Sequence, residues 1–279
     1  MQQEKCSKNS ARWGNEFSTD RKKLKIFLAH RGLFSSEVQM SFLKRIISAI
    51  KLVFSKPSSP KTDSPVSYPV PPINEPASSN PNERGSLAWY GANYDKAEIN
   101  PKYLSSAKKA AQTVLAGKER YKVIADHFGL PWWVIGCIHW REASCSFKGV
   151  LHNGEKIIGT GRKTSLVPRG RGPFESWEEA AIDAIKFDSI DTKCKRYGLS
   201  LEGILKAQEA YNGMGYFNYH PDQLSCYLYS YTNLVKPYGR YTHDGKYDYN
   251  ADANDYSGIV PIIKLLAEQG EIELVRFQA

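Results

Sequence analysis

The sequence predicts an α+β domain that is mainly α-helical and contains one small β-hairpin region. Capping residues followed by apolar residues at helical spacing predict the helices. Short alternating residues that end in Asn153-Gly154 predict the hairpin, because this dipeptide is typical of tight hairpin turns. The chain has 279 residues, of which 41% are hydrophobic, and this is an ordinary content for a protein that buries a core.

Three parts are expected along the chain. Eight of the fifteen prolines lie between Pro57 and Pro81, interleaved with serine, so residues 55–86 are expected to form an extended linker. Residues 87–279 form the main domain. Residues 1–54 form a basic N-terminal segment, in which an apolar stripe recurs at helical spacing at Val38, Phe42, Ile46, Ile47, Ile50, Val53 and Phe54.

The positive charge belongs to the N-terminal segment. The net charge of the chain is +9, and residues 1–60 hold 12 basic and 4 acidic residues, 12 − 4 = +8, which leaves 26 − 25 = +1 for the remainder. A nucleic-acid groove across the main domain is therefore disfavoured, and no nucleic-acid partner is expected. A basic amphipathic helix over residues 21–54 can lie on an anionic membrane or outer-envelope surface; the alternative is a helix that packs within the protein.

The N-terminal sequence and the cysteine content argue against a disulfide framework. The start of the sequence lacks the apolar core of a secretory signal, and no run of 18 apolar residues occurs. The five cysteines include no CxxC pair, which argues against a zinc ribbon, and Cys137 and Cys145 are expected to be packing residues. We therefore expect the protein to be cytoplasmic before release.

The helices of the main domain are expected in two groups that flank a β-rich stretch at residues 147–174. The expected helices begin at Asn100-Pro101, Lys118, Pro131, Ser176, Ser200 and Tyr256. Ser176 and Glu179 form a capping box, in which each side chain satisfies free amides at the helix start. Between Gly213 and Tyr256 the sequence is rich in tyrosine and is expected to be mostly loop.

Glu142 is the main candidate for a catalytic residue. The helix from Pro131 runs through Trp132, Trp133, Ile135 and Ile138 before it reaches this carboxylate. Apolar surroundings raise the pKa of a carboxyl group, and a carboxylic acid that stays protonated near neutral pH can act as a general acid. The alternative is a surface salt bridge at a helix end.

Asp183 and Glu209 are the candidates for a second carboxylate, because each is a charge among apolar or small helix residues. A second carboxylate beside a general acid can activate water as a base or act as a nucleophile. The alternative for each is a buried structural pair or a hydrogen bond to the backbone, since carboxylates on such faces rarely lack a partner.

Two ordered motifs resemble the lysozyme-like superfamily, and more closely the phage and bacterial lysozyme-family muramidases. These are E-A-S-C-S-F at residues 142–147 and A-Y-N-G-M-G-Y at residues 210–216, with a predicted β excursion between them. They are similar to the E-S-x-F and A-Y-N-x-G motifs of goose-type lysozymes and lytic transglycosylases. The segments LHNG, VPRGRGPF and SWEEAAIDA also look like the muramidase group, and the resemblance covers residues 88–266.

The resemblance implies a lysozyme-like fold whose β-hairpin region lies beside a sugar-binding cleft. It implies an endolysin-like glycosidase that cleaves the MurNAc–GlcNAc backbone of peptidoglycan, with Glu142 as the acid and no cofactor or metal. The residues expected to contact glycan are Ser144, Phe147, His152, Asn153, Tyr211, Asn212 and Tyr216. The G-L-M-Q stretch of transglycosylases is replaced by a Gly/Arg-rich region, so hydrolysis and transglycosylation both remain open.

Other functions remain as alternatives. Arg162, Lys163, Arg169 and Arg171 either meet the carboxylates of peptidoglycan stems or form a solvated loop face. His139 and Glu142 have an H-x-x-E spacing, which suggests a zinc endopeptidase fragment but lacks the full H-E-x-x-H motif; the simpler interpretation of His139 is a hydrogen-bonded core residue. A non-catalytic wall-binding module and a chitinase or chitosanase are further alternatives. We expect a monomer.

Overall fold

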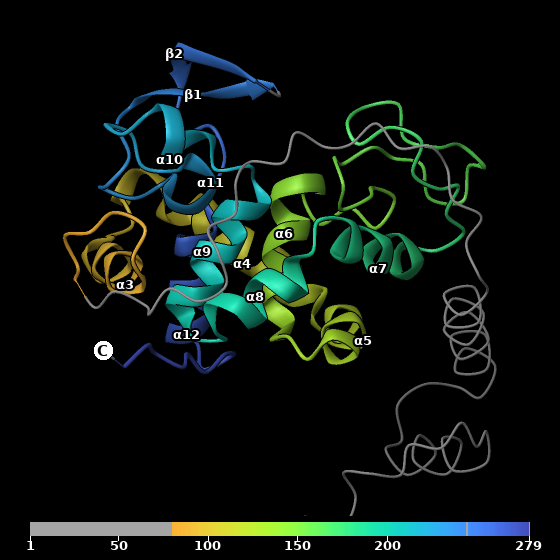
Figure 1. Cartoon of the computed structure of the whole chain (residues 1–279), viewed down its shortest axis with the longest axis horizontal. Coiled ribbons are helices and arrows are strands. Elements are labelled where there is room, and N and C mark those ends of the chain that lie inside the picture. Colours follow the sequence, from red (N-terminus) through yellow and green to blue (C-terminus); the bar gives the residue numbers. More distant parts are fainter. Residues whose placement is uncertain (1–79, 244, 279) are drawn as a thin grey trace, which may run out of the picture. The chain divides into compact units, whose positions relative to one another are not determined.

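A computed structural model describes residues 80–243 and 245–278 (Figure 1). The expectations for residues 1–54, and for residues 55–79 of the linker, lie outside this part. The described chain is mainly helical and contains a two-stranded antiparallel sheet. Its elements are α3 (Leu87–Lys96), η1 (Pro101–Tyr103), α4 (Leu104–Ala116), α5 (Lys118–Phe128), α6 (Trp132–Ala143), α7 (Trp177–Phe187), α8 (Ile190–Tyr197), α9 (Leu201–Tyr211), α10 (Gly215–Tyr219), α11 (Cys226–Tyr229), β1 (Tyr238–His243), β2 (Lys246–Asp252) and α12 (Ile259–Glu268).

Helix α6 runs through the core. Every residue from Trp133 to His139 is buried, and α4, α5 and α12 pack around the helix. Its apolar sequence explains this position, since a helix that is hydrophobic on all sides is stable only when surrounded. The helix ends at Ser144 and Cys145, which both adopt left-handed backbone conformations (φ 50° and 56°), and their N–H groups donate to the carbonyls of Trp140 and His139. This end turns the chain sharply after Glu142.

The predicted capping residues begin two further helices. Ser176 accepts a hydrogen bond from the Glu179 N–H at the start of α7, and Ser200 accepts one from the Gly203 N–H at the start of α9. The Glu179 carboxylate accepts from the N–H of Glu175, which completes the capping box one residue earlier than expected. Helix α9 packs against α3 and α8, so these two helices, which the sequence pattern did not predict, cover its sides.

The β-rich excursion predicted for residues 147–174 is wrong. This segment, which we call the 147–174 loop, contains turns and bends but no strand. Five of its glycines have φ between +69° and +91°, a conformation that interrupts a strand. Side chains replace the strand ladder: the Glu155 carboxylate accepts hydrogen bonds from the N–H groups of Ser165 and Leu166, and Thr164 donates to the Pro168 carbonyl. The Asn153-Gly154 turn itself is present, with Gly154 at φ +76°.

The hairpin lies instead in the tyrosine-rich region that was expected to be loop. Strands β1 and β2 pair antiparallel, with Tyr238 opposite Asp252 and Tyr241 opposite Tyr247. Tyrosine alternates with polar residues in β2, β1 contains two further tyrosines, and the sequence between the strands contains Asp244-Gly245. Aromatic alternation around Asp-Gly is a hairpin signal, so the correct position was available in the sequence.

Residues 80–86 pack on the domain, although they were assigned to the linker. The Arg84 guanidinium donates to the backbone carbonyls of Tyr216 and Pro221, next to α10. Ser86 is the N-cap of α3 and accepts a hydrogen bond from the Trp89 N–H. The folded domain therefore begins before Leu87.

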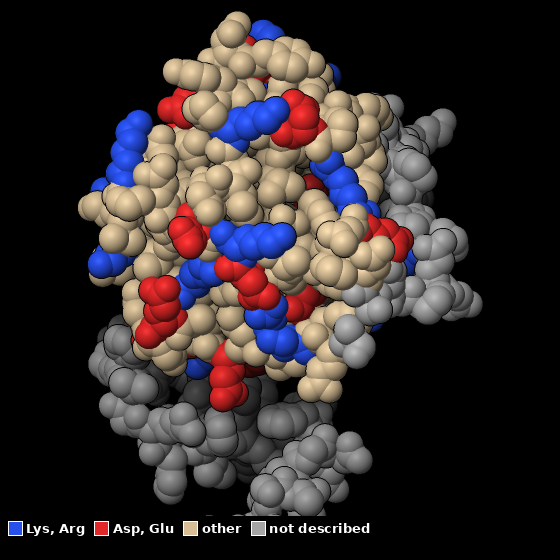
Figure 2. Space-filling model, turned by 90° about the vertical axis from the view of Figure 1, so that its left-hand side faces the viewer, with Lys and Arg blue, Asp and Glu red and all other residues tan. Residues whose placement is uncertain are grey.

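The described surface mixes charges of both signs. On the face drawn in Figure 2, lysine and arginine side chains are interspersed with aspartate and glutamate. Several of the described charges form ion pairs, such as Arg276 with Asp95 and Glu202. None of the helices in the described part of the chain has both the length and the apolar character that crossing a bilayer requires.

Candidate functional site

Glu142 lies at the C-terminal end of α6 and is partly buried. The hydroxyl of Tyr227, on α11, donates to its Oε1 at 3.2 Å. Burial raises the pKa of Tyr227, and the Glu142 carboxylate raises it further, so the phenol remains a hydrogen-bond donor at any physiological pH. Glu142 is thus a sheltered carboxyl group whose orientation is fixed by a neutral donor.

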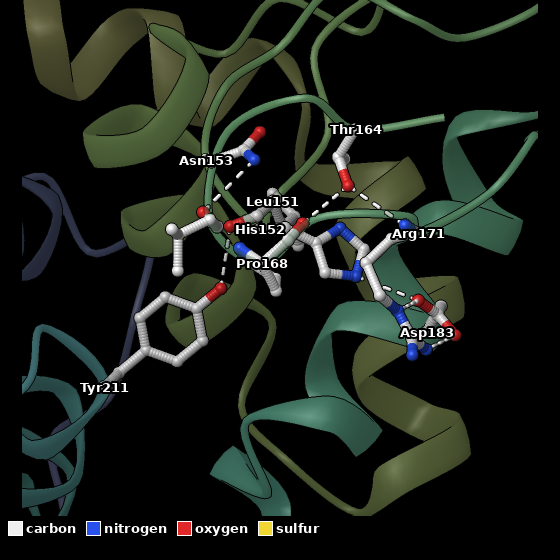
Figure 3. Close-up of polar contacts among 9 residues, drawn as sticks. Leu151, His152, Asn153, Thr164, Pro168, Arg171, Asp183 and Tyr211 are labelled. Atoms are coloured by element: carbon white, nitrogen blue, oxygen red, sulfur yellow. Dashed lines mark hydrogen bonds and ion pairs between the residues drawn. The ribbon is translucent and has the colours of Figure 1, made fainter. Parts of the chain in front are cut away.

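Tyr211, from the A-Y-N-G motif, approaches the same place from α9. Its hydroxyl donates to the Leu151 carbonyl at 2.7 Å, which joins the end of α9 to the 147–174 loop (Figure 3). Burial raises the pKa of Tyr211, followed by the charges of Asp188 and Glu142. Leu151 lies three residues before Gly154, whose backbone approaches Glu142, so the two motifs contact the same loop.

Gly154 brings the 147–174 loop against the backbone of Glu142. A Cβ atom at position 154 would lie 2.1 Å from the Glu142 carbonyl oxygen, so only glycine allows this approach. Asn153 shapes the turn before it: its Oδ1 accepts from the Glu155 N–H at 3.1 Å, and its Nδ2 donates to the Val167 carbonyl at 3.2 Å (Figure 3). Asn153 thus forms part of the loop structure.

The segment before α12 closes another side of the site. Arg141 donates to the Ser257 carbonyl at 2.9 Å, and its guanidinium lies over the ring of Tyr227 at 4.9 Å. The Tyr256 ring stacks on Trp140, and its hydroxyl forms a 2.9 Å hydrogen bond with the exposed Ser144 hydroxyl. Ser144 therefore remains near Glu142 and at the surface.

Asp183 is held in an ion-pair network between α7 and the 147–174 loop. It pairs with the Arg171 guanidinium through both carboxylate oxygens, and His152 Nε2 lies 2.9 Å from its Oδ2 (Figure 3). Burial alone would raise the pKa of Asp183, but the hydrogen bonds from His152 and Arg171 outweigh burial and lower it. This geometry supports the structural alternative for Asp183.

Glu209 is also engaged within the protein. It is 2% exposed, and the Tyr90 hydroxyl on α3 donates to its Oε2 at 2.5 Å. Burial raises the pKa of Glu209 and disfavours the charged form. A carboxyl group enclosed in this way cannot face a substrate, so the geometry again supports the structural alternative.

Three residues that were expected to contact glycan are instead packing residues. The His152 side chain is fully buried and bonded to Asp183. Tyr216 is 4% exposed, and its hydroxyl accepts from the Tyr241 N–H. Phe147 packs against Trp177 in an aromatic cluster, with Arg120 over its ring at 3.8 Å. Sequence position placed these side chains near the site, and the structure shows each of them engaged in packing within the domain.

The remaining expected contacts differ in exposure. Asn212 caps the end of α9 and is exposed. Arg162, Lys163 and Arg169 are exposed on the 147–174 loop, so their charges are accessible to an anionic group. Arg171, the fourth cation that was expected to meet peptide-stem carboxylates, is instead bound to Asp183.

His139 is a core residue, as the simpler interpretation predicted. It is 0% exposed, its Nε2 lies 3.1 Å from the Ser146 carbonyl, and its Nδ1 lies 2.9 Å from the Tyr121 hydroxyl. A carbonyl only accepts, so Nε2 carries the hydrogen and Nδ1 accepts from tyrosine. Burial lowers the pKa of His139 to about 4, and both nitrogens of the neutral ring are occupied by protein partners.

Tyr227, Tyr256 and Asp188 belong to the site but were not predicted. Tyr227 lies on a helix of four residues, which is too short to leave a periodic signal. Asp188 ends α7, and burial raises the pKa of its carboxyl group, which lies close to Tyr211. The cluster of tyrosines at residues 227–231 was the available signal, but it does not distinguish core residues from site residues.

No protein-family model, curated protein or solved structure significantly matches this chain. The functional argument therefore depends on the residues around Glu142.

Proposed function

We propose that the domain is a peptidoglycan glycosidase that cleaves the MurNAc–GlcNAc backbone, with Glu142 as the general acid. One observation carries the proposal: a partly buried glutamate at the end of a core helix is oriented by the Tyr227 hydroxyl and rests against the loop to which Tyr211 is hydrogen-bonded. The lysozyme-like resemblance of the two motifs, and their proximity in the fold, support this activity over other uses of a carboxyl group.

The chemistry requires one proton donor at the scissile bond. Glu142 protonates the glycosidic oxygen as the bond to the anomeric carbon breaks, and the leaving sugar departs as an alcohol. Positive charge develops on the ring oxygen and anomeric carbon, and the carboxylate left on Glu142 stabilises it. The anomeric carbon is then attacked by water in a hydrolase, or by a hydroxyl of the same sugar in a lytic transglycosylase.

Asp183 and Glu209 have no direct role in this proposal. Each carboxyl group already accepts hydrogen bonds within the protein, and these bonds would have to break before it could reach a substrate. The only catalytic assignment is therefore Glu142, with Tyr227 as a positioning residue. The exposed cations Arg162, Lys163 and Arg169 are placed to meet the carboxylates of peptide stems, which fits peptidoglycan better than the uncharged chitin.

The decisive variant is Glu142→Gln, which keeps the shape of the side chain and removes its acid. We expect activity on purified peptidoglycan to fall about 10²–10⁴-fold with the fold intact. Glu119→Gln is the matched control, because Glu119 is an exposed helical glutamate with its side chain 84% accessible. Loss of turbidity measures the rate, and mass analysis of the released muropeptides distinguishes reducing from anhydro ends.

Full activity of the Glu142→Gln variant would refute the proposal. A wild-type protein that sediments with cell walls but releases no sugar ends would instead identify a non-catalytic binding module. Inhibition by a chelator, together with release of amines, would identify an endopeptidase.

A further inference from the structure

Aromatic side chains of α10 and the β1–β2 hairpin form a continuous array. Its members, which we call the tyrosine array, are Tyr216, His220, Tyr241, Tyr247 and Tyr249. Successive tyrosine centroids lie 5.2 Å apart from Tyr216 to Tyr241, 5.2 Å from Tyr241 to Tyr247 and 4.9 Å from Tyr247 to Tyr249. The array begins in the core, with Tyr216 4% exposed, and ends at the surface, with Tyr249 73% exposed.

The Tyr247 ring is held in place by its neighbours. His220 stacks on Tyr247 with a centroid distance of 3.4 Å and an interplanar angle of 14°. A Cβ atom at Gly239 would lie 2.5 Å from the Tyr247 hydroxyl oxygen, so this glycine makes room for the ring. Since little freedom remains to the Tyr247 ring, a contact with this ring carries a small entropic cost.

The array is continuous with the surroundings of Glu142. The Cys226 thiol at the start of α11 lies 3.8 Å from the carbonyl oxygen of Gly239 in β1, so α11 contacts the hairpin that carries the array. Tyr227, the next residue of α11, donates to Glu142. Figure 1 shows the hairpin next to α10 and α11, the helix that carries Tyr227.

The charge of this region favours an uncharged ligand. Strands β1 and β2 contain two basic residues, Arg240 and Lys246, and two acidic residues, Asp248 and Asp252, and α10 contains neither kind. Arg240 is also paired with Asp255. Nucleic acids and anionic lipids are recognised by an excess of cations, which these elements lack.

We propose that the outer end of the tyrosine array, at Tyr247 and Tyr249, binds the uncharged sugar rings of a glycan strand and extends the substrate-binding surface outward from Glu142. Aromatic rings offer apolar faces to the C–H faces of a sugar, and phenol hydroxyls can bond to sugar hydroxyls. Tyr249 supplies the accessible ring at the outer end. This inference rests on the proposed glycosidase activity, because it takes the same polymer as the ligand.

The test compares affinities in the full chain carrying Glu142→Gln, which prevents turnover in the proposed reaction. A soluble β-1,4-linked oligomer of N-acetylglucosamine is titrated into this parent and into variants that add one substitution at Tyr249 or at a control position. We expect Tyr249→Ala to weaken the Kd about 2- to 12-fold, the range for one aromatic contact. Tyr249→Phe keeps the ring and is expected to bind as the parent does.

Val275→Ala is the matched control, because Val275 is a large apolar residue that is 68% exposed outside the array. It should leave the Kd unchanged. An unchanged Kd for Tyr249→Ala, or a parent that does not bind the oligomer, would overturn the proposal. So would a Tyr249→Ala variant whose only change is lost self-association in sedimentation velocity, since the array would then bind a second copy of the chain.

The result of this binding test can be distinguished from a failure of the proposed function. Binding is measured with intact oligomer, as checked by mass spectrometry, and does not depend on which residue is the acid. Activity retained by Glu142→Gln would refute the proposed catalytic assignment while leaving the comparison at Tyr249 readable. A Kd for Tyr249→Ala equal to that of the parent would refute glycan binding by the array and leave the Glu142 result unchanged.

Discussion

A side chain at position 154 would collide with the backbone of Glu142. The added Cβ atom of Gly154→Ala would lie 2.1 Å from the Glu142 carbonyl oxygen, in a residue with φ +76°. Gly161 also has a positive φ, +72°, but a Cβ atom there would meet no atom within 4 Å. Comparing the two alanine variants therefore separates the collision from backbone strain.

We expect Gly161→Ala to lower the free energy of unfolding by about 1 kcal/mol through strain alone. Gly154→Ala should lower it by about 2–4 kcal/mol, because the loop must also move away from α6. Thermal unfolding measures both effects, and wall-degrading activity should fall only for Gly154→Ala. Equal losses of stability would show that the loop does not rest on Glu142.

Two tyrosines of α11 provide a second comparison at the scale of single atoms. The Tyr227 hydroxyl donates to Glu142, whereas the Tyr229 hydroxyl is buried and has no hydrogen-bond partner among the described residues. Tyr227→Phe should lower kcat about 2- to 12-fold with little change in KM, the equivalent of one hydrogen bond that orients the acid. Tyr229→Phe should retain activity.

The two phenylalanine variants should also differ in stability. Tyr229→Phe removes an unsatisfied buried hydroxyl and is expected to raise the free energy of unfolding by about 1 kcal/mol. A rise in KM for Tyr227→Phe with no change in kcat would contradict a positioning role for this tyrosine.

At the scale of elements, the Asp183 network ties the 147–174 loop to α7. His152 and Arg171 lower the pKa of Asp183 in the folded state against the effect of burial. A carboxyl group with a lowered pKa contributes stability above its unfolded pKa of about 3.9, and this contribution is lost as the pH falls through the folded pKa. Asp183→Asn should therefore lower the melting temperature at pH 7.

The melting-temperature difference between wild type and Asp183→Asn should shrink as the pH is lowered below about 4, because the wild-type carboxylate then becomes protonated. Asp191→Asn is a suitable control, since the Asp191–Lys195 ion pair is longer, at 3.9 Å, and lies within α8. A difference that stays constant from pH 7 to pH 3 would show that the charge of Asp183 does not stabilise the loop.

Local rules predicted some elements well. Ser176 and Ser200 begin helices because their side chains satisfy nearby amides, and this depends on three or four neighbouring residues. The hairpin was placed wrongly, because a turn dipeptide does not reveal whether the flanking residues find strand partners. The glycines around Asn153-Gly154 and the bonds of Glu155 replace a strand ladder there.

The site was predictable only in part, because its members come from distant segments. The apolar sequence of α6 indicated a sheltered Glu142, and the structure shows that the loop against Glu142 is also bonded to Tyr211, 69 positions later in the chain. Nothing in the sequence revealed that Glu209 bonds to Tyr90 or that Asp183 bonds to Arg171. Such partners are set by helix packing, which periodicity does not specify.

At the scale of the whole molecule, the boundary of the domain can be tested by truncation. Deletion of residues 1–79 retains Arg84 and Ser86, whereas deletion of residues 1–86 removes the α3 cap and the contacts of Arg84 with α10. Loss of a serine cap alone costs about 1 kcal/mol. We expect the protein of residues 87–279 to melt at a lower temperature than the protein of residues 80–279. The protein of residues 80–279 should retain full activity on isolated wall.

The deletion of residues 1–79 also tests the role of the basic N-terminal segment. If residues 21–54 deliver the enzyme to an anionic envelope surface, the protein lacking residues 1–79 should act more weakly on whole cells than the full chain, while isolated wall is degraded at the same rate. Added salt should narrow the difference, because screening weakens attraction to anionic lipids. Equal potency on whole cells would rule out delivery, since residues 80–279 are unchanged in this comparison and only access to the wall differs.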